Sequence, residues 1–81
     1  MTDARQALDD TKRQIVDYLQ GHPYAADGVR GIREWWLGDN NDVDIALVEK
    51  ALEQLLVEGR VMRASLPDGG SLFAAPLGPN Q

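Results

Sequence analysis

The sequence contains no cysteine, so disulfide bonds and thiolate-bound metals are excluded. Its one histidine, His22, lies beside a proline, and its only serines are Ser65 and Ser71, so a Ser-His or Cys-His catalytic group lacks its parts. No apolar run approaches the roughly 18 residues that span a bilayer, and the first residues lack the apolar core of a signal peptide. We therefore expect a cytoplasmic, non-enzymatic protein without membrane contact, cofactor, bound metal or small-molecule substrate.

Positive charge is also scarce, with 8 Lys and Arg against 13 Asp and Glu and a net charge of −5. Proteins that bind nucleic acid usually carry a basic surface, because neutralised phosphates supply most of their non-specific affinity. The acidic balance makes a nucleic-acid partner less expected. The length of 81 residues suits one domain whose small core leaves no room for a deep active-site pocket.

The first segment with helical periodicity covers residues 2–20. Gly21 ends this helix, and Pro23 prevents its continuation. Residues 24–26 then form either a brief strand or an extended connector. One face of the helix carries the residues expected to be buried: Ala4, Leu8, Thr11, Ile15, Val16 and Leu19.

A second, shorter helix is predicted over residues 27–37, with Asp27 as its N-cap. Val29, Ile32 and Trp36 form its apolar stripe, so Trp36 is expected in the core. Two glycines in this segment lower the stability of the helix by about 1 kcal/mol each relative to alanine. Tertiary packing must therefore hold it.

The third helix is predicted over residues 44–58, with Asp42 or Asp44 as its N-cap and Gly59 directly after its end. Its apolar stripe is dense and combines with those of the other helices. The predicted core cluster comprises Val48, Leu52, Leu55, Trp36, Ile32, Ile15 and Leu19.

After the third helix the pattern becomes extended. Two short apolar-rich runs, residues 60–66 and 71–75, flank a Pro-Asp-Gly-Gly turn, which predicts an antiparallel hairpin. Gly69 or Gly70 is expected at positive φ. Residues 76–81 form a tail with no pattern that predicts order.

This order of helix, short extended link, helix, polar turn, helix and hairpin resembles the winged helix-turn-helix superfamily over about residues 4–75. The likeness is greatest in residues 43–75, where a helix ending in LEQLLVEG precedes Arg60, Val61 and the Pro-Asp-Gly-Gly turn. The resemblance implies an α+β domain over residues 1–75, a three-helix winged helix with a C-terminal two-stranded β-hairpin wing. In this family the third helix commonly enters the DNA major groove, whereas many members are protein-interaction modules.

An oxygen-rich cluster precedes the third helix and comprises Asp39, Asn40, Asn41, Asp42 and Asp44. A Ca²⁺-binding loop also requires a central glycine and a distal glutamate. Ile45 and Ala51 occupy those two positions, so we interpret the cluster as a helix-capping turn.

The predicted outward face of the third helix carries Ala46, Lys50, Glu53 and Val57. From residue 42 to residue 58 there are five acidic residues and one lysine, a net charge of −4, which disfavours insertion between phosphates. Trp35, at the edge of the second helix's stripe, is either partly buried against a neighbouring helix or an exposed interface anchor. These residues are our interface candidates for a protein partner or for self-association, the function that we favour.

The alternative is a DNA-binding transcription regulator that uses the third helix and the wing. Its contact candidates are Arg30, Arg33, Lys50 and Arg63. The three arginines would contact phosphates that flank a groove. The more expected state is that these arginines are solvated or paired with neighbours such as Glu34.

Overall fold

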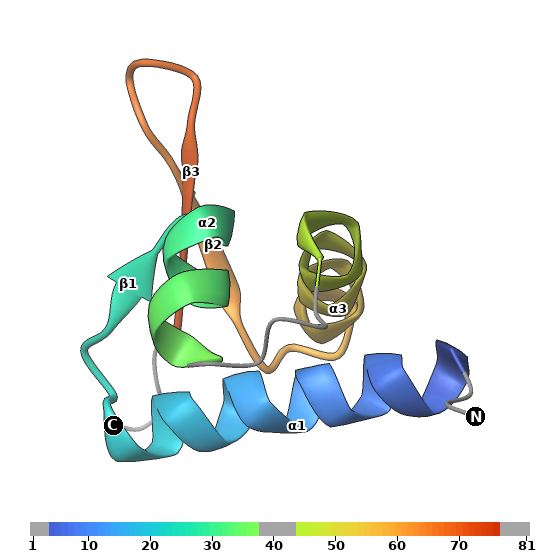
Figure 1. Ribbon diagram of the computed structural model, residues 1–81. Helices are drawn as coiled ribbons and strands as arrows, with labels where there is room; N and C mark the ends of the chain where they lie inside the picture. Colours follow the sequence, from blue (N-terminus) through green and yellow to red (C-terminus); the bar gives the residue numbers. More distant parts are fainter. Residues whose placement is uncertain (1–3, 38–43, 77–81) are drawn as a thin grey trace.

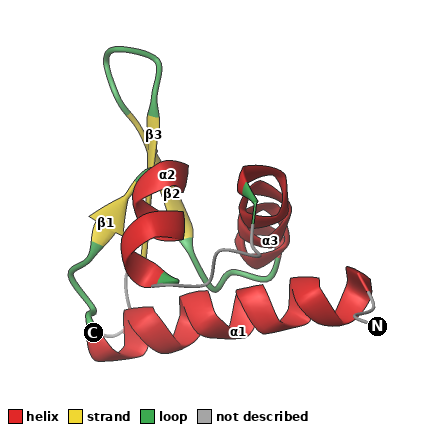
Figure 2. Ribbon diagram, viewed as in Figure 1, coloured by secondary structure: helices red, strands yellow, loops and turns green. Residues whose placement is uncertain are grey.

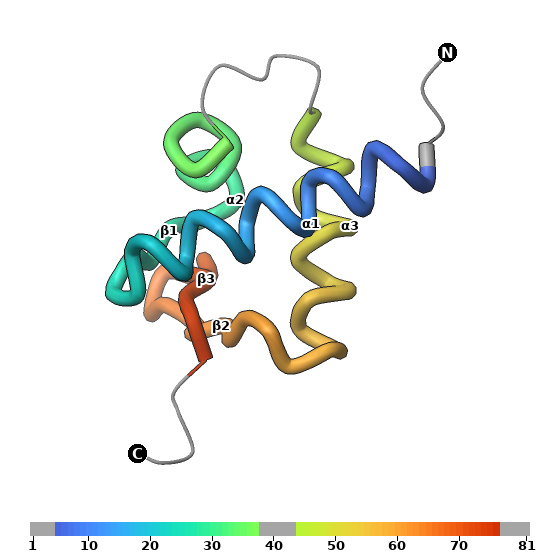
Figure 3. Tube along the Cα trace, turned by 90° about the horizontal axis from the view of Figure 1, so that it is seen from below, coloured from blue at the N-terminus to red at the C-terminus, as the bar shows by residue number. Residues whose placement is uncertain are grey.

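The computed structural model describes residues 4–37 and 44–76 and shows an α+β fold (Figure 1). In chain order the elements are α1 (Ala4–Gly21), β1 (Ala26–Asp27), α2 (Val29–Gly31), η1 (Ile32–Trp36), α3 (Ile45–Val57), β2 (Met62–Ser65) and β3 (Ser71–Ala74). α1 lies along the base, the α2–η1 segment and α3 stand above it, and β2 and β3 rise past α2 (Figure 1, Figure 2). Seen from below, α1 crosses α3 (Figure 3).

α1 buries most of the face that its periodicity predicts; Val16 is half-buried, and the side chain of Ala4 lies outside the described part of the structure. Leu8, Ile15 and Leu19 are core residues, and Thr11 is buried among them, with its hydroxyl donating to the carbonyl oxygen of Ala7 at 2.8 Å. This bond satisfies the one polar group on that face. The face packs against α3 and η1, which places α1 under the other helices.

The second helical segment differs from its prediction. A single α-helical turn, α2, continues into a π-helical turn, η1, in which Leu37 N–H donates to the carbonyl of Ile32 at 3.1 Å. The N-cap is Gly28, so the prediction of Asp27 was wrong. Asp27 lies instead in strand β1, where its carboxylate accepts a hydrogen bond from the indole of Trp36. A side chain used in this way is not available to cap a helix.

α3 has the ends that the sequence predicts. Asp44 is its N-cap and accepts a hydrogen bond from Leu47 N–H at 2.9 Å. At the other end Gly59 adopts φ 77°, and Arg60 N–H donates to the carbonyl of Leu55 at 2.8 Å. This is the Schellman arrangement, which requires a left-handed residue and favours glycine.

The sheet has three antiparallel strands in the order β1-β3-β2: the two of the predicted hairpin and β1, whose first residue, Ala26, lies in the segment left open as a brief strand or a connector. β2 pairs with β3, with Arg63 opposite Phe73, so the predicted antiparallel pairing of these two runs is confirmed. The added strand is β1, in which Asp27 also lies opposite Phe73 on the other edge of β3. The connecting turn places Gly69 at φ 94°, as expected for one of its two glycines.

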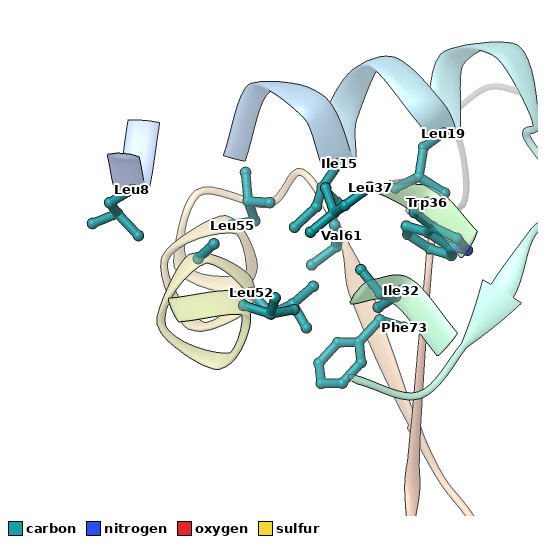
Figure 4. Packing of buried hydrophobic residues seen from close by; sticks show 12 residues of the cluster. Leu8, Ile15, Leu19, Ile32, Trp36, Leu37, Leu52, Leu55, Val61 and Phe73 are labelled. Atoms are coloured by element: carbon teal, nitrogen blue, oxygen red, sulfur yellow. The ribbon is translucent and has the colours of Figure 1, made fainter. Parts of the chain in front are cut away.

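One core cluster joins α1, α3, η1 and the sheet (Figure 4). All seven residues of the predicted cluster belong to it. The complete set is Leu8, Ile15, Leu19, Ile32, Trp36, Leu37, Val48, Ala51, Leu52, Leu55, Val61 and Phe73. Among the described residues, no helix combines the length and the apolar composition needed to cross a membrane.

Candidate functional site

The outward face of α3 is as the sequence predicts. Ala46, Lys50, Glu53 and Val57 are all exposed, and their helical spacing puts them in one row along the helix. Val57, the last residue of α3, is 88% exposed, so its apolar side chain is open to solvent. Four of the five interface candidates therefore share one surface.

The fifth candidate, Trp35, belongs to η1 and is 68% exposed. Its neighbour Trp36 is a core residue, 6% exposed, as predicted. Of the two states left open for Trp35, the structure shows the exposed one. Sequence reasoning missed another exposed aromatic residue, Tyr24, at 97% exposure, because nothing in its short link separates an exposed ring from a packed one.

A hollow of about 500 Å³ lies between α3 and the strands β2 and β3. Its apolar lining consists of Val29, Leu52, Leu56 and Phe73, and its polar lining of Glu49, Glu53, Arg63 and Ser71. We call this hollow the α3–hairpin groove. Leu52 and Phe73 are themselves core residues, so the packed interior forms part of its floor (Figure 4).

The groove is acidic on its α3 side. Glu49 and Glu53 are exposed and one helical turn apart, a spacing at which like charges repel. Within residues 4–37 and 44–76, neither carboxylate has an ion pair or a hydrogen bond. Glu58, in contrast, forms salt bridges with both Lys12 and Arg60. The groove thus presents two carboxylates whose charge the described part of the domain does not neutralise.

The four DNA-contact candidates lie on four elements. Arg30 is exposed on α2, Arg33 half-buried on η1, and Lys50 and Arg63 exposed on α3 and β2. Arg63 borders the α3–hairpin groove, whereas Lys50 borders a different hollow, together with Leu8 of α1. Lys50 and Arg63 therefore lie beside different hollows, on opposite flanks of α3.

The described residues contain no group of three or more His, Asp or Glu side chains arranged to hold a metal ion. The predicted capping role of Asp44 is confirmed, and the other members of its oxygen-rich cluster, residues 39–42, lie outside the described residues. His22 is exposed at the end of α1, and its ring stacks on Tyr18 with a centroid distance of 4.1 Å. Its ring nitrogen also lies 3.1 Å from the carbonyl oxygen of Tyr18, which is a local structural contact.

Comparison of the chain with known protein families, with curated proteins and with solved structures finds no match.

Proposed function

We propose that this domain is a non-catalytic protein-binding module whose contact surface is the outward face of α3 together with the α3–hairpin groove. One observation carries the proposal: Glu49 and Glu53, which have no ion pair among the described residues, lie on an exposed helix face that also holds Val57. Such a surface is complementary to a partner segment that combines basic and apolar side chains.

The charge on α3 argues against a nucleic-acid groove as the place where this helix docks. From Asp44 to Glu58 the described helix and its caps carry four acidic residues and one lysine, Lys50. A helix that enters a DNA groove is positioned by donors to the phosphates on both sides. Here the groups nearest the phosphates would be carboxylates.

Self-association through the same surface is disfavoured for a similar reason. A two-fold interface uses the same patch of both copies, so Glu49 and Glu53 of each copy would bring four carboxylates into one interface. The proposed partner is therefore a different protein.

The winged-helix assignment is part of this proposal. It is supported by three helical segments followed by an antiparallel β2–β3 hairpin that extends beyond the helices (Figure 1). In that superfamily the third helix and the hairpin form a shared binding surface, which corresponds to the α3–hairpin groove.

A DNA-binding regulator remains the second candidate, because Arg30 and Arg63 are both exposed. These two side chains, on α2 and β2, would contact phosphates together with the other two candidates, Arg33 and Lys50. The second candidate predicts binding that depends on both arginines and weakens as salt increases.

The test is selection of binders from a displayed library of random short peptides. We expect enrichment of peptides that mix arginine or lysine with aliphatic residues. Glu53→Lys should abolish the enrichment, while Asp17→Lys, an equal charge change at an exposed position on α1 outside the groove, should preserve it. Enrichment that is absent, or unchanged by Glu53→Lys, would refute the proposal.

Duplex DNA binding by the unmodified domain that is lost on Arg30→Ala plus Arg63→Ala would establish the second candidate instead.

A further inference from the structure

We infer that the α3–hairpin groove is a pocket for a single arginine side chain of the partner protein. The inference rests on the proposed function and specifies its ligand. It follows from the apolar floor of the groove, from the placement of its two carboxylates and from the single cation on its far side.

The floor suits the aliphatic part of an arginine. Leu52 and Phe73 are 1% and 7% exposed, so they form a rigid, packed support beneath the groove, and most of the apolar surface open to a ligand belongs to the half-buried residues of the lining. Leu56 and Val29 are half-buried beside them and complete the apolar lining. Long cationic side chains cover apolar surface with their methylene groups while the charged head stays at the polar edge.

The rim suits the guanidinium group. Glu49 and Glu53 are separated by one helical turn, which places their Cβ atoms about 5–6 Å apart. A guanidinium has five N–H donors in a rigid plane and bridges two acceptors in this way better than an ammonium group does. Its binding would also remove the repulsion between the two carboxylates.

The opposite rim limits the occupant to one cation. Arg63 on β2 borders the same groove and carries no ion pair among the described residues. Its positive charge would repel a second basic side chain, and its guanidinium is available to a backbone carbonyl of the partner. Ser71 contributes a half-buried hydroxyl on the same side. An isolated arginine between apolar residues therefore fits better than a polybasic run.

The test uses a capped Leu-Arg-Leu peptide as the probe and follows the backbone amide signals of the intact domain by NMR. We expect saturable shifts at the groove residues Leu56, Arg63 and Phe73. Replacing arginine with citrulline, which keeps the shape and removes the charge, should weaken binding by about tenfold or more, as should Glu53→Gln. Asp17→Asn, with the same charge change on α1, should leave the affinity unchanged, and unchanged spectra elsewhere in each variant confirm that it is folded.

Two results would overturn the inference. Equal affinity for the citrulline peptide would show that the carboxylates do not recognise a cation. Shifts confined to the other flank of α3, around Lys50, would place the ligand outside the groove. Either result leaves the peptide selection described above intact, so failure of the arginine pocket is distinguishable from failure of the protein-binding proposal.

Discussion

The indole N–H of Trp36 donates a hydrogen bond to the carboxylate of Asp27 at 2.9 Å, which joins η1 to strand β1. The same indole stacks on Tyr18 of α1, with a centroid distance of 5.0 Å and an interplanar angle of 10°. Trp36 thus connects three elements that are separate in the sequence. Asp27 in turn lies opposite Phe73, which lines the α3–hairpin groove. The hydrogen bond between Trp36 and Asp27 therefore helps to hold the strand that pairs with this side of the groove.

Trp36→Phe should lower the free energy of unfolding by about 1–3 kcal/mol, because it leaves the half-buried carboxylate of Asp27 without its donor. Asp27→Ala should have a comparable effect, since the indole N–H then lacks an acceptor. Urea unfolding of both single variants and of the double variant measures the coupling. The double variant should be less destabilised than the sum of the two, and strict additivity would show that the bond contributes nothing.

Gly31→Ala should destabilise the domain although alanine is the better helix former. A Cβ at this position would lie 2.8 Å from Oδ1 and 2.9 Å from Cγ of Asp27, whose side chain is held by Trp36. Gly21→Ala is the matched control, because a Cβ there has no neighbour within 4 Å among the described residues. Thermal unfolding should show a lower Tm for Gly31→Ala and an equal or higher Tm for Gly21→Ala; an increase in both would contradict the proposed close contact.

Leu52→Ala should cost about 2–5 kcal/mol, since the side chain is 1% exposed and packs in the centre of the core. Val57→Ala, two positions before the C′ glycine on the same helix, should change stability by less than about 0.5 kcal/mol because Val57 is 88% exposed. Denaturant titration of the two variants separates core from surface. A large loss for Val57→Ala would mean that its side chain is covered in solution.

α3 is the element that the sequence predicts most completely. Its apolar stripe, its N-cap Asp44 and its terminal Gly59 are local signals that agree with one another, and all three are found. The hairpin is similarly local, because a Pro-Asp-Gly-Gly turn between two apolar runs is enough to specify it. The exposed row on α3 then follows from helical periodicity alone.

The region around Asp27 was not predictable in the same way. Strand β1 has two residues and pairs with Phe73 and Ala74 far along the chain, so the local pattern left residues 24–26 open between a strand and a connector and did not extend a strand to Asp27. An aspartate before an apolar stripe is typical of an N-cap, and only the tertiary contact with Trp36 assigns it another role. The π-helical turn at Ile32 is likewise invisible to a periodicity that fits the α-helix equally well.

The groove also depends on tertiary structure. Its lining comes from α2, α3, β2 and β3, which no local pattern in the sequence brings together. The sequence indicated an acidic helix, while the structure adds the apolar floor beneath the two carboxylates. That combination turns a charge pattern into a candidate pocket.

Glu53→Lys should stabilise the isolated domain by about 0.2–0.5 kcal/mol. It replaces the repulsion between Glu49 and Glu53 with an attraction at the same spacing, which the like charge of Lys50, three residues before the new lysine, offsets in part. Chemical unfolding at low ionic strength measures the gain, which should shrink as salt is added. A loss of stability would show that Glu53 makes a favourable contact in the unbound domain and would remove the evidence that its charge is kept for a partner.

The most direct test of the central claim is fluorescence anisotropy at low salt, with a labelled Leu-Arg-Leu peptide and a labelled duplex DNA as alternative ligands. The unmodified domain should bind the peptide and show no binding to the duplex. A double variant, Glu49→Lys plus Glu53→Lys, should lose the peptide and acquire salt-dependent duplex binding, because two repulsive groups on α3 become attractive to phosphate. Duplex binding by the unmodified domain, with a log–log salt slope of about −3 to −4 as expected for four phosphate contacts, would contradict the account.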